Sequence, residues 1–233
     1  MPRSRQSWRS LKRRWPRVSK NETASFKVRE TRVDNFTAAV AALQRGEVIV
    51  YPTETLYGLG ADALDCAAVE KVFQLKGRDP NNPIPVLVAE RNMLNALVTE
   101  VSPLAEKLIA RFWPGPLTIV LPARKDIPAP LVNSTGGVGV RISSQIIATE
   151  LVRTLGRPLT ATSANPSGKA PSRTMRKAKS YFANAIEIFL DAGELTSKTG
   201  STVIEFHGEK IKIIRDGDIK QAELQAIVGE DVI

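Results

Sequence analysis

Apolar residues along the chain follow two alternating spacings from residue 34 onward. Runs such as Val48–Tyr51 have the length of a buried strand, whereas Ala67–Leu75 places its apolar residues at helical spacing. Polar and glycine-containing stretches separate such segments. The pattern predicts strands at Glu47–Tyr51, Ile84–Val88, Leu117–Leu121, Val138–Ile142, Leu159–Ala161, Ile186–Leu190, Thr202–Phe206 and Ile211–Arg215, and helices at 34–44, Ala67–Leu75, Met93–Val98, Leu104–Phe112, Ile146–Leu155, Thr174–Ala183 and Ala222–Val228.

Strands and helices that alternate in this way favour one α/β domain over residues 34–233. The last two strands are joined by the short turn His207–Gly208, which is typical of an antiparallel hairpin. We therefore expect a twisted, open, mixed sheet with flanking helices. The chain has no apolar run of about 18 residues, so no membrane span is expected.

The net charge of +9 is concentrated in the first 33 residues. Eleven of the 33 basic residues lie there, with only Glu22 and Glu30 as acidic residues. The remaining chain carries 22 charges of each sign and is neutral overall. The sequence thus predicts a basic, disordered N-terminal tail at residues 1–33, followed by a neutral domain.

Three interpretations of this tail remain open. Its cations could contact RNA phosphates while Trp8 and Trp15 stack on bases. It could be a targeting segment, since its start is rich in arginine and serine and poor in acidic residues. It could also be a solvated extension with no specific function, which is the usual behaviour of charge blocks.

Several kinds of catalytic site are disfavoured by composition. Cys66 is the only cysteine and His207 the only histidine, which leaves little for a zinc site or a Ser-His-Asp triad. We interpret Cys66 as a small packing residue, and a single cysteine fits a reducing, cytoplasmic location. No phosphate-binding glycine motif opens a helix. A nucleotide would have to be bound by scattered polar groups and cations, with Mg²⁺ held mainly by its phosphates.

Candidate binding groups follow the ends of the predicted strands and helices. A loop rich in hydroxyls and glycine covers Thr53–Gly60. Lys76 and Arg78 follow a helix, where two cations suit a phosphate or carboxylate but also suit the helix dipole. Arg141 ends an apolar strand and requires water, a partner or a ligand anion. Short polar side chains also follow strand ends, at Ser163–Ala164–Asn165.

Taken together and in order, these motifs resemble the YrdC/TsaC family of threonylcarbamoyl-AMP synthases. The resemblance covers residues 35–215 and rests on Pro-Thr-Glu-Thr-x-Tyr-Gly-Leu-Gly from Pro52, Lys-Gly-Arg from Lys76, Trp-Pro-Gly-Pro-Leu-Thr from Trp113, Ser-Ala-Asn from Ser163 and Ser-Thr-Val from Ser201. It implies a twisted open α/β sheet around a positively lined cavity. It also implies that L-threonine, bicarbonate and ATP react to give threonylcarbamoyl-AMP and pyrophosphate, in a nucleotidyl transfer that a partner transferase completes on tRNA.

The resemblance also implies roles for particular residues. Lys76 and Arg78 would hold phosphates and bicarbonate and carry the catalysis. Thr55, Arg141 and Ser201 would hold threonine, with Arg141 pairing its carboxylate. Mg²⁺ would arrive with ATP, and the protein itself is not expected to supply a metal site. The nucleotide would contact Lys76 and Arg78 and, in addition, Asn82, Ser163, Asn165 and Arg215.

The sequence departs from the family pattern in two places. Some relatives carry a histidine a few residues after the Asn-Pro, and Leu87 stands near that place here, so a threonine contact is expected to be missing or replaced. Some relatives carry a second domain, whereas this chain ends soon after Arg215 and is expected to be of the single-domain type. Two alternative functions remain: an RNA-binding module of the same fold, and a carbamoyl-transfer module like those inside hydrogenase-maturation proteins.

Overall fold

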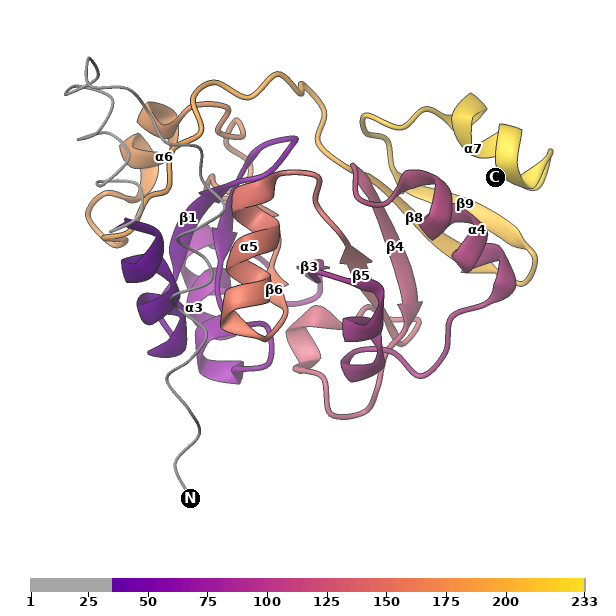
Figure 1. Cartoon of the computed structure of the whole chain (residues 1–233), viewed down its shortest axis with the longest axis horizontal. Coiled ribbons are helices and arrows are strands. Elements are labelled where there is room, and N and C mark those ends of the chain that lie inside the picture. The colour runs from indigo at the N-terminus through magenta and orange to yellow at the C-terminus, as the bar shows by residue number, and fades with distance from the viewer. Residues whose placement is uncertain (1–34, 233) are drawn as a thin grey trace, which may run out of the picture. The chain divides into compact units, whose positions relative to one another are not determined.

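The computed structural model describes residues 35–232, so the predicted tail and Asp34 lie outside the described residues. Residues 35–44 are helical. No helix within the described part of the chain is long and apolar enough to cross a membrane. The further elements in Figure 1 are β1 (Ile49–Pro52), β2 (Tyr57–Gly60), α3 (Cys66–Lys76), β3 (Val86–Leu87), the 3-10 helix η1 (Arg91–Ala96), α4 (Pro103–Phe112), β4 (Leu117–Pro122), the 3-10 helix η2 (Ala129–Leu131), β5 (Gly137–Arg141), α5 (Ile146–Leu155), β6 (Leu159–Thr160), β7 (Thr162–Ser163), α6 (Met175–Phe182), β8 (Thr202–His207), β9 (Lys210–Arg215) and α7 (Gln221–Val228).

The strands form two sheets, and the chain segment with β6 and β7 contributes one strand to each. Three strands pair in the order β1-β2-β7, and six pair in the order β6-β3-β5-β4-β8-β9. The chain passes from the larger sheet to the smaller at Ala161, between β6 and β7. Both parallel and antiparallel pairs occur in the larger sheet. The predicted α/β class with a mixed sheet is confirmed, but the strands divide into two sheets instead of one.

Helix α3 ends in a left-handed cap that determines where the predicted cations lie. Asp65 begins the helix by accepting hydrogen bonds from the backbone N–H groups of Ala67 and Ala68. Gly77 ends it with φ of 55°, a conformation that strains residues carrying a Cβ. The chain turns sharply at Gly77, so Lys76 and Arg78 leave the helix end in different directions, as their contacts below show.

The stretch predicted as a loop at Thr53–Gly60 ends in strand β2. The prediction was wrong for the last four residues, which form a strand. The glycines in this strand leave room for a neighbouring side chain and do not mark a loop. A Cβ at Gly60 would lie 2.8 Å from Cε1 of Tyr51, whose ring covers this part of the sheet. The two glycines of β2 therefore make room for an aromatic ring of the neighbouring strand.

Other differences from the predicted elements are local. The expected strand at Ile186–Leu190 makes only a parallel bridge through Phe189 to Val50, so it does not extend into a ladder. The expected helix at Met93–Val98 is the 3-10 helix η1. Cys66 is the exposed first residue of α3, which corrects its interpretation as a packing residue.

Two apolar clusters hold the elements together. The larger lies under β4, β5 and β8 and includes Ile119, Val140 and Ile204, all fully buried. The smaller includes Leu151 of α5 and Leu43, packed against the outer side of β1. Figure 1 shows α5 beside β1 and β6. The larger cluster also contains Val50 of β1 and Leu59 of β2, so apolar packing joins the two sheets.

Candidate functional site

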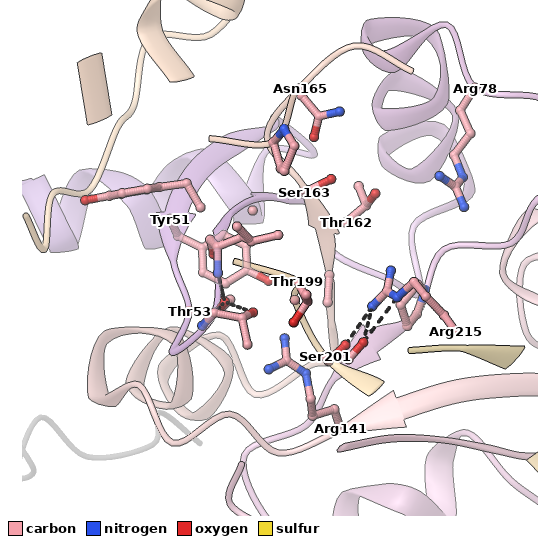
Figure 2. Close-up of a pocket in the computed structure, with 18 residues that line it drawn as sticks. Tyr51, Thr53, Arg78, Arg141, Thr162, Ser163, Asn165, Thr199, Ser201 and Arg215 are labelled. Carbon is pink, nitrogen blue, oxygen red and sulfur yellow. Dashed lines mark hydrogen bonds between the residues drawn. The ribbon is translucent and has the colours of Figure 1, made fainter. Parts of the chain in front are cut away.

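A polar pocket lies where segments from both sheets converge. The turn between β1 and β2, the end of β5, the chain around β7 and the segment before β8 all contribute to it (Figure 2). The described residues that line it include three arginines and several hydroxyl groups, but no carboxylate, histidine or cysteine. The lining residues are Tyr51, Thr53, Thr55, Leu56, Tyr57, Gly58, Arg78, Pro85, Arg141, Ala161, Thr162, Ser163, Asn165, Pro171, Thr199, Gly200, Ser201 and Arg215.

The turn between β1 and β2 is held by the hydroxyl of Thr53. This hydroxyl donates to the carbonyl oxygen of Leu56 at 2.7 Å and accepts from the backbone N–H groups of Thr55 and Leu56. It also lies 3.0 Å from the hydroxyl of Thr55. Either of these two hydroxyls can donate to the other. The Thr55 hydroxyl lines the pocket, where it can meet a polar group of a ligand.

Arg141 lies at the end of β5, and its side chain is only 6% exposed. One terminal nitrogen, Nη1, pairs with Oε1 of Glu54, and the hydroxyl of Ser143 donates to the other carboxylate oxygen, Oε2. Burial lowers the pKa of Arg141 to about 10, which leaves the guanidinium charged at neutral pH. The arginine meets the pocket with its charge already balanced by Glu54.

Ser201 joins the site to β9 through Arg215. Arg215 donates from Nε and Nη2 to the carbonyl oxygen of Ser201 at 3.1 and 2.7 Å, and from Nη2 to the hydroxyl at 2.8 Å. The hydroxyl of Thr118, on β4, lies 3.0 Å from that of Ser201. Figure 2 shows Ser201 between Arg141 and Arg215. The predicted threonine and nucleotide contacts thus adjoin one another at this serine.

Arg78 lies on the same side of the pocket as Arg215 in the view of Figure 2, away from Arg141. It donates from Nε to the carbonyl oxygen of Asn82 at 2.7 Å and from Nη2 to that of Pro83 at 3.2 Å. Burial lowers the pKa of Arg78. Burial and then the charge of Arg78 lower the pKa of Arg215. These two arginines repel one another and are held by neutral oxygens, so an anion between them would be favoured.

Asn82 does not line the pocket, although it was predicted to contact the nucleotide. The residue is exposed, and its part in the site is the backbone carbonyl that orients Arg78. The prediction came from the family resemblance, which assigned Asn82 to the nucleotide. A contact between the Asn82 side chain and the nucleotide stays a prediction.

Lys76 is likewise absent from the pocket lining and is only 3% exposed. Its Nζ donates to the carbonyl oxygens of Ser163 and Asn165, the latter at 2.7 Å. Burial first, and then the charge of Arg78, lower the pKa of Lys76 to about 7. The structure brings Arg78 to the pocket and places Lys76 behind it, where it holds the turn after β7. A direct contact between Lys76 and phosphate stays a prediction.

Asn165 carries the one buried side-chain oxygen or nitrogen that has no partner among the described residues, its Oδ1. Its Nδ2 donates to the carbonyl oxygens of Pro166 and Lys169 at 2.9 and 2.8 Å. These two bonds fix the orientation of the amide. Since an unpaired buried acceptor is unfavourable, Oδ1 is suited to an N–H or O–H group of a ligand.

Sequence reasoning missed several residues that shape the site. Glu54 was part of a quoted motif, but no pattern showed that it would pair with Arg141, 87 positions away. Thr118 likewise meets Ser201 only through the pairing of β4 with β8. Leu87 is buried in the smaller apolar cluster and does not line the pocket, although it stands opposite Arg141 in the register of β3 and β5.

Comparison with known proteins places these features in a family. The profile of the Sua5, YciO and YrdC family, described as "Telomere recombination", matches residues 41–217. A threonylcarbamoyl-AMP synthase of Pyrococcus abyssi is 37% identical over 210 residues, which cover 89% of this chain and 62% of that protein. A threonylcarbamoyl-AMP synthase of Thiobacillus denitrificans is 36% identical over 171 residues, which cover 73% of this chain and 90% of that protein.

A solved structure gives the same result. The crystal structure of P. abyssi Sua5 complexed with L-threonine matches with a TM-score of 0.81 and 36% identity, over 85% of this chain and 58% of that one. The present chain therefore spans somewhat less than two thirds of the Pyrococcus protein. Its α/β fold, its ordered motifs and its profile match agree with one another, and the chain belongs to the Sua5/YciO/YrdC family.

Proposed function

We propose that the protein is an L-threonylcarbamoyladenylate synthase, a nucleotidyl-transferring enzyme that makes threonylcarbamoyl-AMP and pyrophosphate from L-threonine, bicarbonate and ATP. One observation carries the proposal. The pocket gathers Arg78, Arg141 and Arg215 among hydroxyl groups, while its described lining contains no carboxylate, histidine or cysteine. The names of the relatives in Pyrococcus and Thiobacillus support the same activity.

This lining suits a reaction in which the substrates supply the reacting groups. The threonine amine attacks the carbon of bicarbonate, and water leaves to give a carbamate. A carbamate oxygen then attacks the α-phosphorus of ATP, and pyrophosphate leaves with its electron pair. The protein contributes position and charge: it holds the two reactants together and stabilises the negative charge that develops on phosphate oxygens.

The contacts in the pocket support a proposed place for each substrate. Arg141 would pair the threonine carboxylate, while Thr55 and Ser201 would meet its other polar groups. Arg78 and Arg215 lack a carboxylate partner among the described residues and would bind the phosphates. Ser163 and the free Oδ1 of Asn165 would contact the nucleotide beside them, and Lys76 would support that turn from behind.

Mg²⁺ is proposed to enter with ATP. The described residues contain no group of three or more histidine, cysteine, aspartate or glutamate side chains that could hold a metal. Mg²⁺ commonly keeps several waters and binds mainly through substrate phosphates, so ATP and not the pocket lining would hold it. When bound, it would neutralise phosphate charge and favour departure of pyrophosphate.

The product implies a partner and a location. Threonylcarbamoyl-AMP is a mixed anhydride, and we propose that a separate transferase passes its acyl group to tRNA. Because ATP, bicarbonate and tRNA are available there, we propose that the enzyme acts in the cytoplasm. Co-purification with such a transferase and cell fractionation would test these two points. An RNA contact through residues 1–33 stays a prediction, because that segment lies outside the described residues.

The decisive experiment is pyrophosphate release from ATP and bicarbonate with L-threonine present or omitted. We expect release only when threonine, bicarbonate and ATP are all present. Release that does not depend on threonine would contradict the assignment and favour a carbamoyl-transfer module. RNA binding without any release would favour an RNA-binding module. A variant that lacks residues 1–33 is expected to keep full release, because every residue assigned to the chemistry lies after Asp34.

A further inference from the structure

Glu54 forms an ion pair unlike the others among the described residues. Its side chain is 14% exposed and that of Arg141 is 6% exposed, whereas every other ion pair recorded there has at least one partner that is 39% exposed or more. A buried ion pair is a weak source of stability, because both charges lose their hydration. Its presence beside the pocket therefore points to a role in recognition.

Both oxygens of the Glu54 carboxylate are occupied by partners from the end of β5. Oε1 pairs with Nη1 of Arg141, and Oε2 accepts from the hydroxyl of Ser143. Glu54 itself sits in the turn that the Thr53 hydroxyl holds through Leu56. The carboxylate thus fastens the turn between β1 and β2 to the end of β5. These are the two segments that carry Thr55 and Arg141.

The pairing leaves part of Arg141 available. A guanidinium has five N–H groups, and of the Arg141 nitrogens the Glu54 carboxylate accepts from Nη1 alone. The nitrogens Nε and Nη2 have no acceptor among the described residues, and Arg141 lines the pocket. Glu54 therefore fixes the orientation of the guanidinium through Nη1. The N–H groups of Nε and Nη2 are left to donate to a substrate carboxylate.

The ion pair with Glu54 also affects which kind of anion Arg141 binds. An unpaired buried Arg141 would attract any small anion, including phosphate and pyrophosphate. Paired with Glu54, it offers directed N–H donors with no net charge. That arrangement suits an amino acid, which carries one charge of each sign and is neutral overall. Multiply charged anions are disfavoured at this end of the pocket, since the carboxylate of Glu54 repels them.

We infer that Glu54 is a positioning residue that orients Arg141 for the substrate carboxylate and keeps phosphate-type anions away from the amino-acid end of the pocket. This inference rests on the proposed function and deepens it, because it assigns the discrimination between threonine and phosphate to one residue outside the pocket lining. Glu54 acts through Arg141, so its removal should change threonine affinity more than ATP affinity.

The test is the kinetics of Glu54→Gln, which keeps the shape of the side chain and removes its charge. We expect the KM for L-threonine to rise about tenfold or more, while the KM for ATP stays within about twofold. Inhibition by inorganic phosphate should become stronger and competitive with threonine. An unchanged threonine KM, or equal increases in both KM values, would overturn the inference.

Glu205→Gln is the matched control. Glu205 is a buried carboxylate of β8 that accepts from Asn133 and Thr135 and does not line the pocket. Its conversion to an amide removes a buried charge from the six-stranded sheet, which also carries Arg141. We expect it to lower the melting temperature but to leave the KM for threonine and inhibition by phosphate unchanged. A rise in threonine KM equal to that of Glu54→Gln would mean that the effect is only structural.

Two further measurements cover the remaining outcomes. Ser143→Ala keeps both charges and removes one tie to Glu54, so it replaces Glu54→Gln if that variant does not fold. It should raise the threonine KM about threefold, and no change would overturn the inference.

Calorimetric titration of L-threonine separates the two proposals. If the wild type binds threonine without releasing pyrophosphate, the synthase assignment fails, while weaker binding by Glu54→Gln still supports the inference. If the wild type binds no threonine, both fail.

Discussion

The two ends of the pocket treat their arginines differently. Arg141 is paired with a carboxylate, that of Glu54, and is almost completely buried. Arg78 and Arg215 are held by neutral oxygens, the backbone carbonyls of Asn82 and Pro83 and both oxygens of Ser201. Each arginine is thus oriented by the protein through part of its guanidinium. Only Arg78 and Arg215, at the other end of the pocket, keep positive charges that no carboxylate among the described residues balances.

This difference shows how one pocket can distinguish two anionic groups. An arginine held by carbonyl oxygens keeps its full charge and favours a polyanion such as triphosphate. An arginine held by a carboxylate offers geometry without net charge and favours the carboxylate of an amino acid. Net charge alone would not separate the two ligands, since the domain outside the basic N-terminal segment is neutral overall.

The largest effect is expected for Arg78→Ala. Loss of a fixed cation at the phosphate end should lower kcat/KM for ATP about 100-fold, because the developing phosphate charge loses a donor. The KM for threonine should change little. Steady-state pyrophosphate release measures both. Arg78→Lys is the control that keeps the charge and loses the planar fork, and it should recover part of the activity. Unchanged kinetics in Arg78→Ala would remove this residue from the site.

Arg215→Met should have the next largest effect. The substitution removes the second phosphate cation and frees Ser201 from its three hydrogen bonds to Arg215. We expect the KM for ATP to rise about tenfold and that for threonine to rise less, since Thr118 still contacts the Ser201 hydroxyl. The ratio of the two KM values is the measurement. A larger effect on threonine than on ATP would reverse our assignment of the two ends.

The stability of the folded protein should depend on pH through Lys76, which lies buried near the charge of Arg78. Burial and then Arg78 hold its pKa at about 7, below its ordinary value of 10.5. Between these values the unfolded chain binds more protons than the folded one, so stability rises with pH. Below about pH 7 the lysine is protonated in both states, and its contribution is constant. Relative to Lys76→Met, the wild type should gain up to about 1.4 kcal/mol per pH unit in this window.

Urea unfolding of the wild type and Lys76→Met from pH 6 to pH 10 measures this difference. Arg78→Ala serves as the comparison, because without the neighbouring charge the pKa of Lys76 should lie higher and the window should begin at higher pH. Parallel pH profiles for the wild type and Lys76→Met would show that the lysine keeps its ordinary pKa in the folded protein.

Tyr57→Phe should have the smallest effect. The Tyr57 hydroxyl accepts from the backbone N–H of Ala192 at 3.0 Å and lies within hydrogen-bonding distance of Asp191 and Gly193. It thereby holds the segment that leads to Thr199 and Ser201. Its loss should lower the free energy of unfolding by about 1 kcal/mol and change both KM values by less than about threefold. Thermal unfolding and kinetics test this, and a selective loss of ATP affinity would contradict it.

Sequence patterns predicted the order of most helices and strands because each has its own local signal. The β8–β9 hairpin, for example, is visible from two apolar runs around His207–Gly208. The division into two sheets was not predictable, because it depends on which partners Leu159–Thr160 and Thr162–Ser163 choose on either side of Ala161.

The sequence likewise predicted part of the candidate site and missed the rest. Motif order identified Arg78, Arg141 and Ser201, and the structure brings all three to one pocket. It did not separate Lys76 from Arg78, because the left-handed turn at Gly77 decides which of them reaches the pocket. It did not find the partner of Arg141 either, because that contact forms only when two distant segments meet.

Calorimetric titration of Arg141→Met and Arg78→Met, each with L-threonine and with ATP and Mg²⁺, tests the division of the pocket most directly. The account predicts that Arg141→Met loses affinity for threonine and keeps its affinity for ATP, whereas Arg78→Met does the reverse. Equal losses of both ligands in both variants would contradict the division into an amino-acid end and a phosphate end.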